Sequence, residues 1–283
     1  MRSLRAKDFL KIITGRDLEF RMNPYRFKLL EDVNLDNVEV IHDLEFGQCQ
    51  FRKVTLNQVK LTGAISFTDS QLKSLEITQS DFREIKIKDA RMNRLLVKGN
   101  TAIGSLWVNG SMINELEVSE NQRFETLHIG CANEIQRAVL NSNGFHNGQG
   151  SSSQVYLCPE RFNHLEVDRL NSGKVEFGTF GEFAHMRVND VVASEVALEN
   201  CCNEKSDVLF TNIRPNEEGG SRFKIANSNI GPAVLANSEL KRFKHIQVEN
   251  SSIAEELLML NHINQRKRGN FSSKLASFLF FTW

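Results

Sequence analysis

The fold is decided by residues 63–118, which read GAISFTDSQLKSLEITQSDFREIKIKDARMNRLLVKGNTAIGSLWVNGSMINELEV. In this stretch a large apolar side chain returns every five residues. These ladder residues are Phe67, Leu72, Ile77, Phe82, Ile87, Met92 and Val97. A helix repeats every 3.6 residues and a continuous strand every two, so neither produces a period of five. A chain that turns a corner at every fifth residue does produce it, with the ladder residues pointing inward.

A second inward position lies two residues before each ladder residue. Large and small side chains alternate there: Ile65, Ser70, Leu75, Ser80, Ile85, Ala90 and Leu95. The residue between the two inward positions is polar in nearly every case, as at Gln71, Asp81 and Arg91. Because alternate residues of a strand point to opposite faces, we expect these polar residues to face solvent.

A longer period is superimposed on the ladder, since Val40, Leu61, Phe82, Ile103 and Phe124 lie 21 residues apart. A fixed period near 20 is typical of stacked solenoids. The sequence therefore predicts an all-β solenoid, a parallel β-helix with about 20–21 residues per coil and coils about 4.8 Å apart. The usual hand of parallel crossovers predicts that it is right-handed.

The ladder divides the chain into three parts. We expect an irregular N-terminal cap at 1–32, the β-helix at 33–253, and a C-terminal helix with an apolar tail at 254–283. The helix is predicted to run to Arg268, because Ser252 and Glu255 form a capping box ahead of apolar residues at helical spacing. Loop insertions are predicted where the five-residue spacing is interrupted, at 131–154, 202–207 and 214–221.

The five-residue motif resembles that of the pentapeptide-repeat family, in which a small residue, a polar residue and a Leu or Phe recur. The resemblance is carried by Ser70-Gln71-Leu72, Ser80-Asp81-Phe82 and Ala90-Arg91-Met92, and more loosely by Asn200-Cys201 and Ala236-Asn237-Ser238. It implies a right-handed quadrilateral β-helix. Every second unit carries a large residue, such as Leu75, where the family prefers Ala, so the repeats are degenerate.

Composition excludes several classes of protein. The chain has 35 basic and 35 acidic residues, which lacks the excess charge of a nucleic-acid-binding protein. It has no apolar run of the roughly 18 to 20 residues that span a bilayer, and no signal-peptide-like start. Its odd number of scattered cysteines indicates reduced thiols. These are Cys49, Cys131, Cys158, Cys201 and Cys202. Together these features predict a cytoplasmic location.

No motif for metal binding, nucleotide binding or nucleophilic catalysis is present in the sequence, so we expect neither a cofactor nor an enzymatic activity. A weaker alternative is a carbohydrate-active β-helix enzyme, whose charged residues would converge on one face. The candidates are Asp81, Glu84, Lys86, Lys88, Asp89, Arg91 and Arg94. Their mixed signs favour a solvated face with pairing between coils.

The leading functional interpretation is a non-enzymatic scaffold that binds another macromolecule, with a protein as the expected partner. Trp107 occupies one of the positions between two inward residues and is therefore expected to point outward. With Leu96 and Met112 it is predicted to form an apolar partner-binding patch. Self-association, end to end or side by side, is a further expectation for a solenoid with flat sides.

The C-terminus offers an alternative interpretation, a peripheral or truncated part of a membrane-associated protein at the inner face of the membrane. Basic residues would contact anionic head groups while aromatic residues enter the interface. The candidates are Arg266, Lys267, Arg268, Lys274, Phe278, Phe280, Phe281 and Trp283. The same aromatic residues could instead cover the last coil.

The inward and outward assignment predicts unequal effects of two neighbouring substitutions. Phe82→Ala should lower the free energy of unfolding by roughly 3 to 5 kcal/mol, because it leaves a cavity between coils. Asp81→Ala should be nearly neutral. Chemical denaturation of both variants measures the difference, and equal losses of stability would contradict the assignment.

Overall fold

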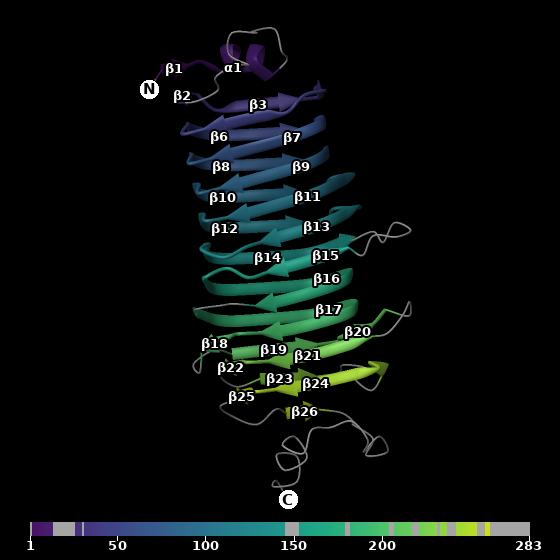
Figure 1. Ribbon diagram of the computed structural model, residues 1–283. Helices are drawn as coiled ribbons and strands as arrows, with labels where there is room; N and C mark the ends of the chain where they lie inside the picture. The colour runs from purple at the N-terminus through teal and green to yellow at the C-terminus, as the bar shows by residue number, and fades with distance from the viewer. Residues whose placement is uncertain are drawn as a thin grey trace, which may run out of the picture.

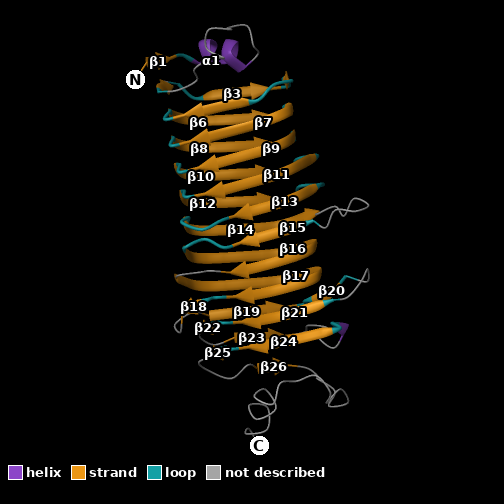
Figure 2. Ribbon diagram, in the orientation of Figure 1, coloured by secondary structure: helices purple, strands orange, loops and turns teal. Residues whose placement is uncertain are grey.

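The computed structural model is a long parallel β-solenoid of about nine turns, with strand β1 (Arg2–Leu4) and strand β26 (Leu258–Leu260) at opposite ends of the stack (Figure 1). The structure describes residues 2–13, 26–29, 31–144, 153–178, 182–203, 207–216, 221–230, 233–236, 242–253 and 258–260. Strands dominate this part of the chain, and its one α-helix lies at the N-terminal end (Figure 2). The predicted all-β solenoid fold is therefore confirmed.

Each coil of the regular region consists of two strands, one in each of two parallel stacks. The first stack contains β6 (Gln50–Asn57), β8 (Gln71–Thr78), β10 (Arg91–Lys98), β12 (Met112–Ser119) and β14 (Glu134–Gly144). The second contains β7 (Lys60–Thr68), β9 (Asp81–Lys88), β11 (Ala102–Asn109), β13 (Phe124–Ile129) and β15 (Gln154–Leu157). Phe82 aligns with Leu61 in the preceding coil and with Ile103 in the next. The observed register thus reproduces the 21-residue period.

Shorter elements complete both ends of the solenoid. The N-terminal ones are β1 (Arg2–Leu4), α1 (Ala6–Ile13), β2 (Phe27–Leu29), β3 (Val33–Asp36), β4 (Glu39–Val40) and β5 (Leu44–Gly47). Toward the C-terminus lie β16 (Arg161–Gly178), β17 (Glu182–Glu199), β18 (Cys202–Asn203), β19 (Asp207–Thr211), β20 (Arg214–Pro215), β21 (Arg222–Ala226), β22 (Asn229–Ile230), β23 (Ala233–Ala236), β24 (His245–Glu249), β25 (Ser252–Ile253) and β26 (Leu258–Leu260). β16 and β17 are long enough to contribute to both stacks.

Side chains point inward and outward as the ladder predicts. All seven ladder residues from Phe67 to Val97 are buried, and so are the seven second inward residues from Ile65 to Leu95. The intervening residues Gln71, Asp81 and Arg91 are exposed. A single column of apolar side chains therefore runs through the stacked coils. Removing these side chains from water supplies the main hydrophobic stabilisation of the folded state.

Residues in the left-handed backbone conformation form corners of the coil, and most of these corners lie between one strand and the next. One column of corners contains Asn37, Gln58, Gln79, Gly99, Glu120 and Ser142, and the other contains Gln48, Asp69, Asp89, Gly110 and Ala132. Their φ angles lie between 49° and 64°. The corner N–H donates to a carbonyl of the next coil, as from Asp89 to Asn109 at 2.9 Å. The corners are therefore part of the hydrogen-bonded stack.

A buried polar residue follows many corners and forms a second set of bonds between coils. Asn100, Asn121 and Asn143 are stacked in the core, each no more than 2% exposed. Asn100 Nδ2 donates to Asn121 Oδ1, and Asn121 Nδ2 donates to Asn143 Oδ1, both at 2.8 Å. Asn100 Oδ1 accepts from the backbone N–H of Ser80 at 2.9 Å. This asparagine ladder satisfies buried corner groups that would otherwise be costly to bury.

Parts of the predicted loop insertions are strands in the described residues. The interval 131–154 was expected to be a loop, but Glu134–Gly144 is strand β14, with Ile135, Ala138 and Leu140 buried. The sequence pattern did not reveal this strand for two reasons. Ala138 stands where most coils carry a large apolar residue, and this coil is 22 residues long, as the alignment of Ile113 with Ile135 shows. The predicted breaks at 202–207 and 214–221 are also shorter, because β18 and β20 lie inside them.

Both ends of the observed solenoid also differ from the predicted boundaries. At the N-terminus, β2 already pairs with β6 and β1 pairs with β2, so the stack begins before Val33. At the C-terminus, the helix predicted from Ile253 to Arg268 is wrong where the structure describes it, because β25 and β26 are strands. β26 pairs in parallel with β23. Pairing with the preceding coil outweighs the helical spacing of the apolar residues.

The asparagine ladder makes a testable contribution to stability. Asn121→Ala should lower the free energy of unfolding by several kcal/mol, because it leaves partners in two neighbouring coils unsatisfied at roughly 1 to 3 kcal/mol each. Asn114→Ala, on the exposed face of β12, is the matched control and should be nearly neutral. Chemical denaturation of both variants checks the difference, and an equally stable Asn121→Ala protein would rule out the role of the ladder.

Candidate functional site

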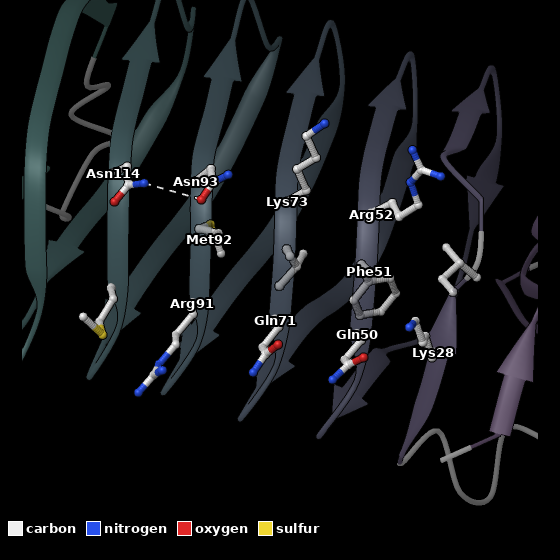
Figure 3. A pocket seen from close by; sticks show the side chains of 13 residues that line it. Lys28, Gln50, Phe51, Arg52, Gln71, Lys73, Arg91, Met92, Asn93 and Asn114 are labelled. Carbon is white, nitrogen blue, oxygen red and sulfur yellow. Dashed lines mark hydrogen bonds between the residues drawn. The ribbon is translucent and has the colours of Figure 1, made fainter.

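A groove of about 540 Å³ runs along the first stack and crosses β2, β6, β8, β10 and β12 (Figure 3). Its lining comes from the first three residues of the longer strands and from β2. The lining residues are Lys28, Leu29, Gln50, Phe51, Arg52, Gln71, Leu72, Lys73, Arg91, Met92, Asn93, Met112 and Asn114. The groove therefore lies across the strands, parallel to the solenoid axis.

Strand alternation gives the groove a floor and two rims. In each long strand the middle residue of the first three points inward, and the residues on either side of it point outward. Figure 3 shows the outward residues as two rows. One row contains Lys28, Gln50, Gln71 and Arg91, and the other contains Arg52, Lys73, Asn93 and Asn114. Because the coils stack in register, each row repeats about every 4.8 Å.

The floor of the groove is apolar and buried. Phe51 is 6% exposed, and Leu72 and Met92 are each 4% exposed, whereas ladder residues such as Phe67 are completely buried. Met112, at the β12 end of the groove, is 44% exposed. Met112 is therefore the lining residue that offers the most exposed apolar surface to a bound chain.

The rims of the groove are basic although the whole chain is neutral. Lys28, Arg52, Lys73 and Arg91 contribute one cation from each of β2, β6, β8 and β10, and none of the thirteen lining residues is Asp or Glu. Arg52 Nε lies 3.3 Å from Asp32 Oδ1, but both side chains are more than half exposed. Such an exposed pair is weak and is readily exchanged for another anion.

Each long strand of the groove also carries a side-chain amide. Asn114 Nδ2 donates to Asn93 Oδ1 at 3.4 Å, as the dashed line in Figure 3 marks. Gln50 and Gln71 occupy the other row. Because an amide both donates and accepts hydrogen bonds, the rims can pair with polar groups of either kind.

A second surface feature lies on the other stack, where aromatic rings line up along the axis. The centroids of Trp107 and His128 are 4.5 Å apart, and those of His128 and Tyr156 are 5.8 Å apart. Lys174 Nζ lies 5.5 Å from the centre of the Tyr156 ring. Burial lowers the pKa of His128, whereas for Lys174 the lowering effect of burial is outweighed by a hydrogen bond and the charge of Glu176, so its pKa is raised.

The structure does not bring the predicted apolar patch together. Trp107 lies on β11 in the second stack, beside Lys86 and His128. Leu96 lies on β10 between Glu76 and Glu117, and Met112 lies on β12 between Arg91 and Glu134. Of the three predicted residues, Met112 belongs to the groove.

The predicted membrane-facing residues, from Arg266 to Trp283, lie outside the described residues, so the membrane interpretation stays a prediction. In the part of the chain that is described, no helix has the length and apolarity needed to cross a bilayer.

The charged residues considered for carbohydrate chemistry lie on two different stacks. Glu84 and Lys86, on β9, form an ion pair at 2.8 Å, whereas Arg94, on β10, pairs with Glu117 at 3.2 Å. Arg91 lines the groove. Within the described ranges, no group of three or more His, Cys, Asp or Glu residues is placed to hold a metal ion. The enzymatic alternative stays a prediction.

Comparisons with protein-family models, with curated proteins and with solved structures found no match. Function is therefore inferred from the surface of the chain itself.

Sequence reasoning missed the groove although its signal is present. The triplets Gln50-Phe51-Arg52, Gln71-Leu72-Lys73 and Arg91-Met92-Asn93 each combine one apolar, one amide and one basic residue. They lie 20 or 21 residues apart, so the shared pattern becomes visible only when the chain is written one coil per line.

The half-buried position of His128 between Trp107 and Tyr156 predicts that the stability of the protein depends on pH. Because the pKa of His128 is lowered in the folded state, the unfolded chain gains a proton near pH 6.5 that the folded chain does not bind. The stability that the folded state owes to neutral His128 is fully present above about pH 6.5, and it is lost as the pH falls toward the folded-state pKa. His128→Phe keeps a ring and does not titrate. Its melting temperature should fall less than that of the wild type between pH 7.5 and pH 5.5, and equal decreases would contradict the prediction.

Proposed function

We propose that this protein is a non-enzymatic β-helical scaffold that binds another protein along the basic groove. The groove is the observation that supports this function. It combines an apolar floor, a cation from each of four successive strands and no lining carboxylate. Binding sites of this kind use apolar contact for affinity and polar groups for orientation.

The strands that form the groove hold it in a fixed shape. Successive strands pair in register, so the rim residues are spaced by the backbone. The ring of Phe51 makes edge-to-face contacts with Phe27 and Phe67, with centroids 5.4 and 5.5 Å apart. Because the backbone of the site is already ordered by strand pairing, binding carries no further entropic cost for ordering that backbone.

We also propose that the coils are degenerate pentapeptide repeats. The support comes from the five-residue sides and from the small or polar residue that follows many corners, such as Ser70, Ser80, Asn100 and Ser111. Ser70 Oγ accepts from the N–H of Cys49, and Ser111 Oγ accepts from that of Ala90, both at 3.1 Å. A small polar residue at this position therefore accepts a hydrogen bond from the backbone of the preceding coil.

Selection from a random peptide library tests the proposed scaffold. The wild-type protein should enrich peptides whose binding falls at least about tenfold in a Lys73→Glu, Arg91→Glu double variant, since both residues line the groove. Arg83→Glu with Lys88→Glu makes the same charge change at exposed positions of β9 in the other stack and should leave binding unchanged. If no peptides are enriched, or if the enriched peptides bind both double variants equally, the proposed function is wrong.

A further inference from the structure

We infer that the occupant of the groove is an extended acidic segment of the partner protein, lying parallel to the solenoid axis. This inference rests on the proposed function and adds the chemistry and direction of the bound segment. It is drawn from the order of side chains along the two rims.

The dimensions of the groove fit a short extended peptide. The groove crosses five strands, and at about 4.8 Å per coil it is roughly 19 Å long. An extended chain rises about 3.3 Å per residue, so about six residues fill this length. Its backbone would run across the strands of the protein and contact both rims.

The charges of the rims select for carboxylates. Lys28, Arg52, Lys73 and Arg91 follow one another on successive coils, so an extended segment meets a cation about every 4.8 Å. The cations are divided between the two rows, with Lys28 and Arg91 in one and Arg52 and Lys73 in the other (Figure 3). Acidic side chains on both faces of an extended peptide can therefore find partners.

The amides of the rims favour a peptide over other polyanions. β6, β8 and β10 each carry one amide opposite one cation, in the pairs Gln50 with Arg52, Gln71 with Lys73 and Asn93 with Arg91. A peptide backbone supplies both N–H donors and carbonyl acceptors, which together satisfy both ends of an amide. Phosphate and sulfate groups supply acceptors, so they match the amide nitrogen alone.

Among the described residues that line it, the groove has no exposed aromatic side chain on which a nucleobase could stack. Phe51 is the one aromatic residue among the thirteen lining residues, and it is only 6% exposed. Proteins that bind single-stranded nucleic acid combine basic grooves with exposed aromatic platforms. The groove therefore lacks one of the two parts that nucleic-acid binding needs.

The β12 end of the groove differs from the rest and indicates where the acidic part of the segment ends. Met112 replaces the cation there and is 44% exposed, and Glu134 aligns with it in the following coil. Because a carboxylate would be repelled by Glu134, the acidic run ends at β12. An apolar residue of the partner is expected to contact Met112.

Fluorescence anisotropy with defined peptides tests the inference. The probes are an eight-residue peptide of Asp and Glu with Leu at one end, its Asn and Gln counterpart, and a Lys counterpart. The acidic peptide should bind at least about tenfold more tightly than the neutral one, and the difference should shrink as the salt concentration rises. The Lys73→Glu, Arg91→Glu variant should lose this preference, and the Arg83→Glu, Lys88→Glu variant should keep it. Lys73→Met replaces the double variant if circular dichroism shows that the latter is unfolded.

The outcomes separate this inference from the proposed function. If the neutral peptide binds as tightly as the acidic one and both are lost in the groove variant, the scaffold function stands and the acidic partner is wrong. If a sulfated oligosaccharide or single-stranded DNA of equal charge binds the groove more tightly than the acidic peptide, the peptide assignment is overturned. If library selection yields groove-binding peptides but the acidic peptide does not bind, the inference alone fails.

Discussion

Hydrogen bonding between successive coils is the constraint on which the whole structure depends. A chain that turns a corner every few residues would bury unpaired N–H groups at each corner unless the next coil supplied acceptors. Backbone carbonyls do so for the left-handed corner residues, and inward Ser and Asn side chains do so for the residues that follow. These bonds keep neighbouring coils in register, so each inward residue meets its counterpart one coil away.

The same constraint produces the groove that we propose as the binding surface. Once coils are in register, every outward position becomes a straight row along the axis, and the chemistry of that row depends on residues about 21 apart in the chain. On the first stack the rows bring Lys28, Arg52, Lys73 and Arg91 beside one floor. On the second stack they bring Trp107, His128 and Tyr156 together. Neither set is recognisable as a cluster within any one segment of the sequence.

Much of the fold was predictable from the sequence because inward positions carry large apolar residues at a fixed period, as from Phe67 to Val97. Prediction failed where small residues fill the same positions, as at Ala138 in β14, and where local spacing favoured a helix over pairing with the previous coil, as at β26. The groove was missed for a different reason. Exposed positions tolerate many residues, so a shared charge pattern emerges only after the register is known.

Because each coil pairs only with its neighbours, the solenoid behaves as a one-dimensional array in which unfolding starts most easily at an end. The groove begins at β2, close to the N-terminal end, and spans five strands in successive coils. A chain bound there would contact all of these coils at once and would stabilise them against fraying through linkage. Occupancy of the groove by the proposed partner and order at this end of the solenoid would therefore be thermodynamically coupled, so dissociation of that partner would lower the local stability of the terminal coils.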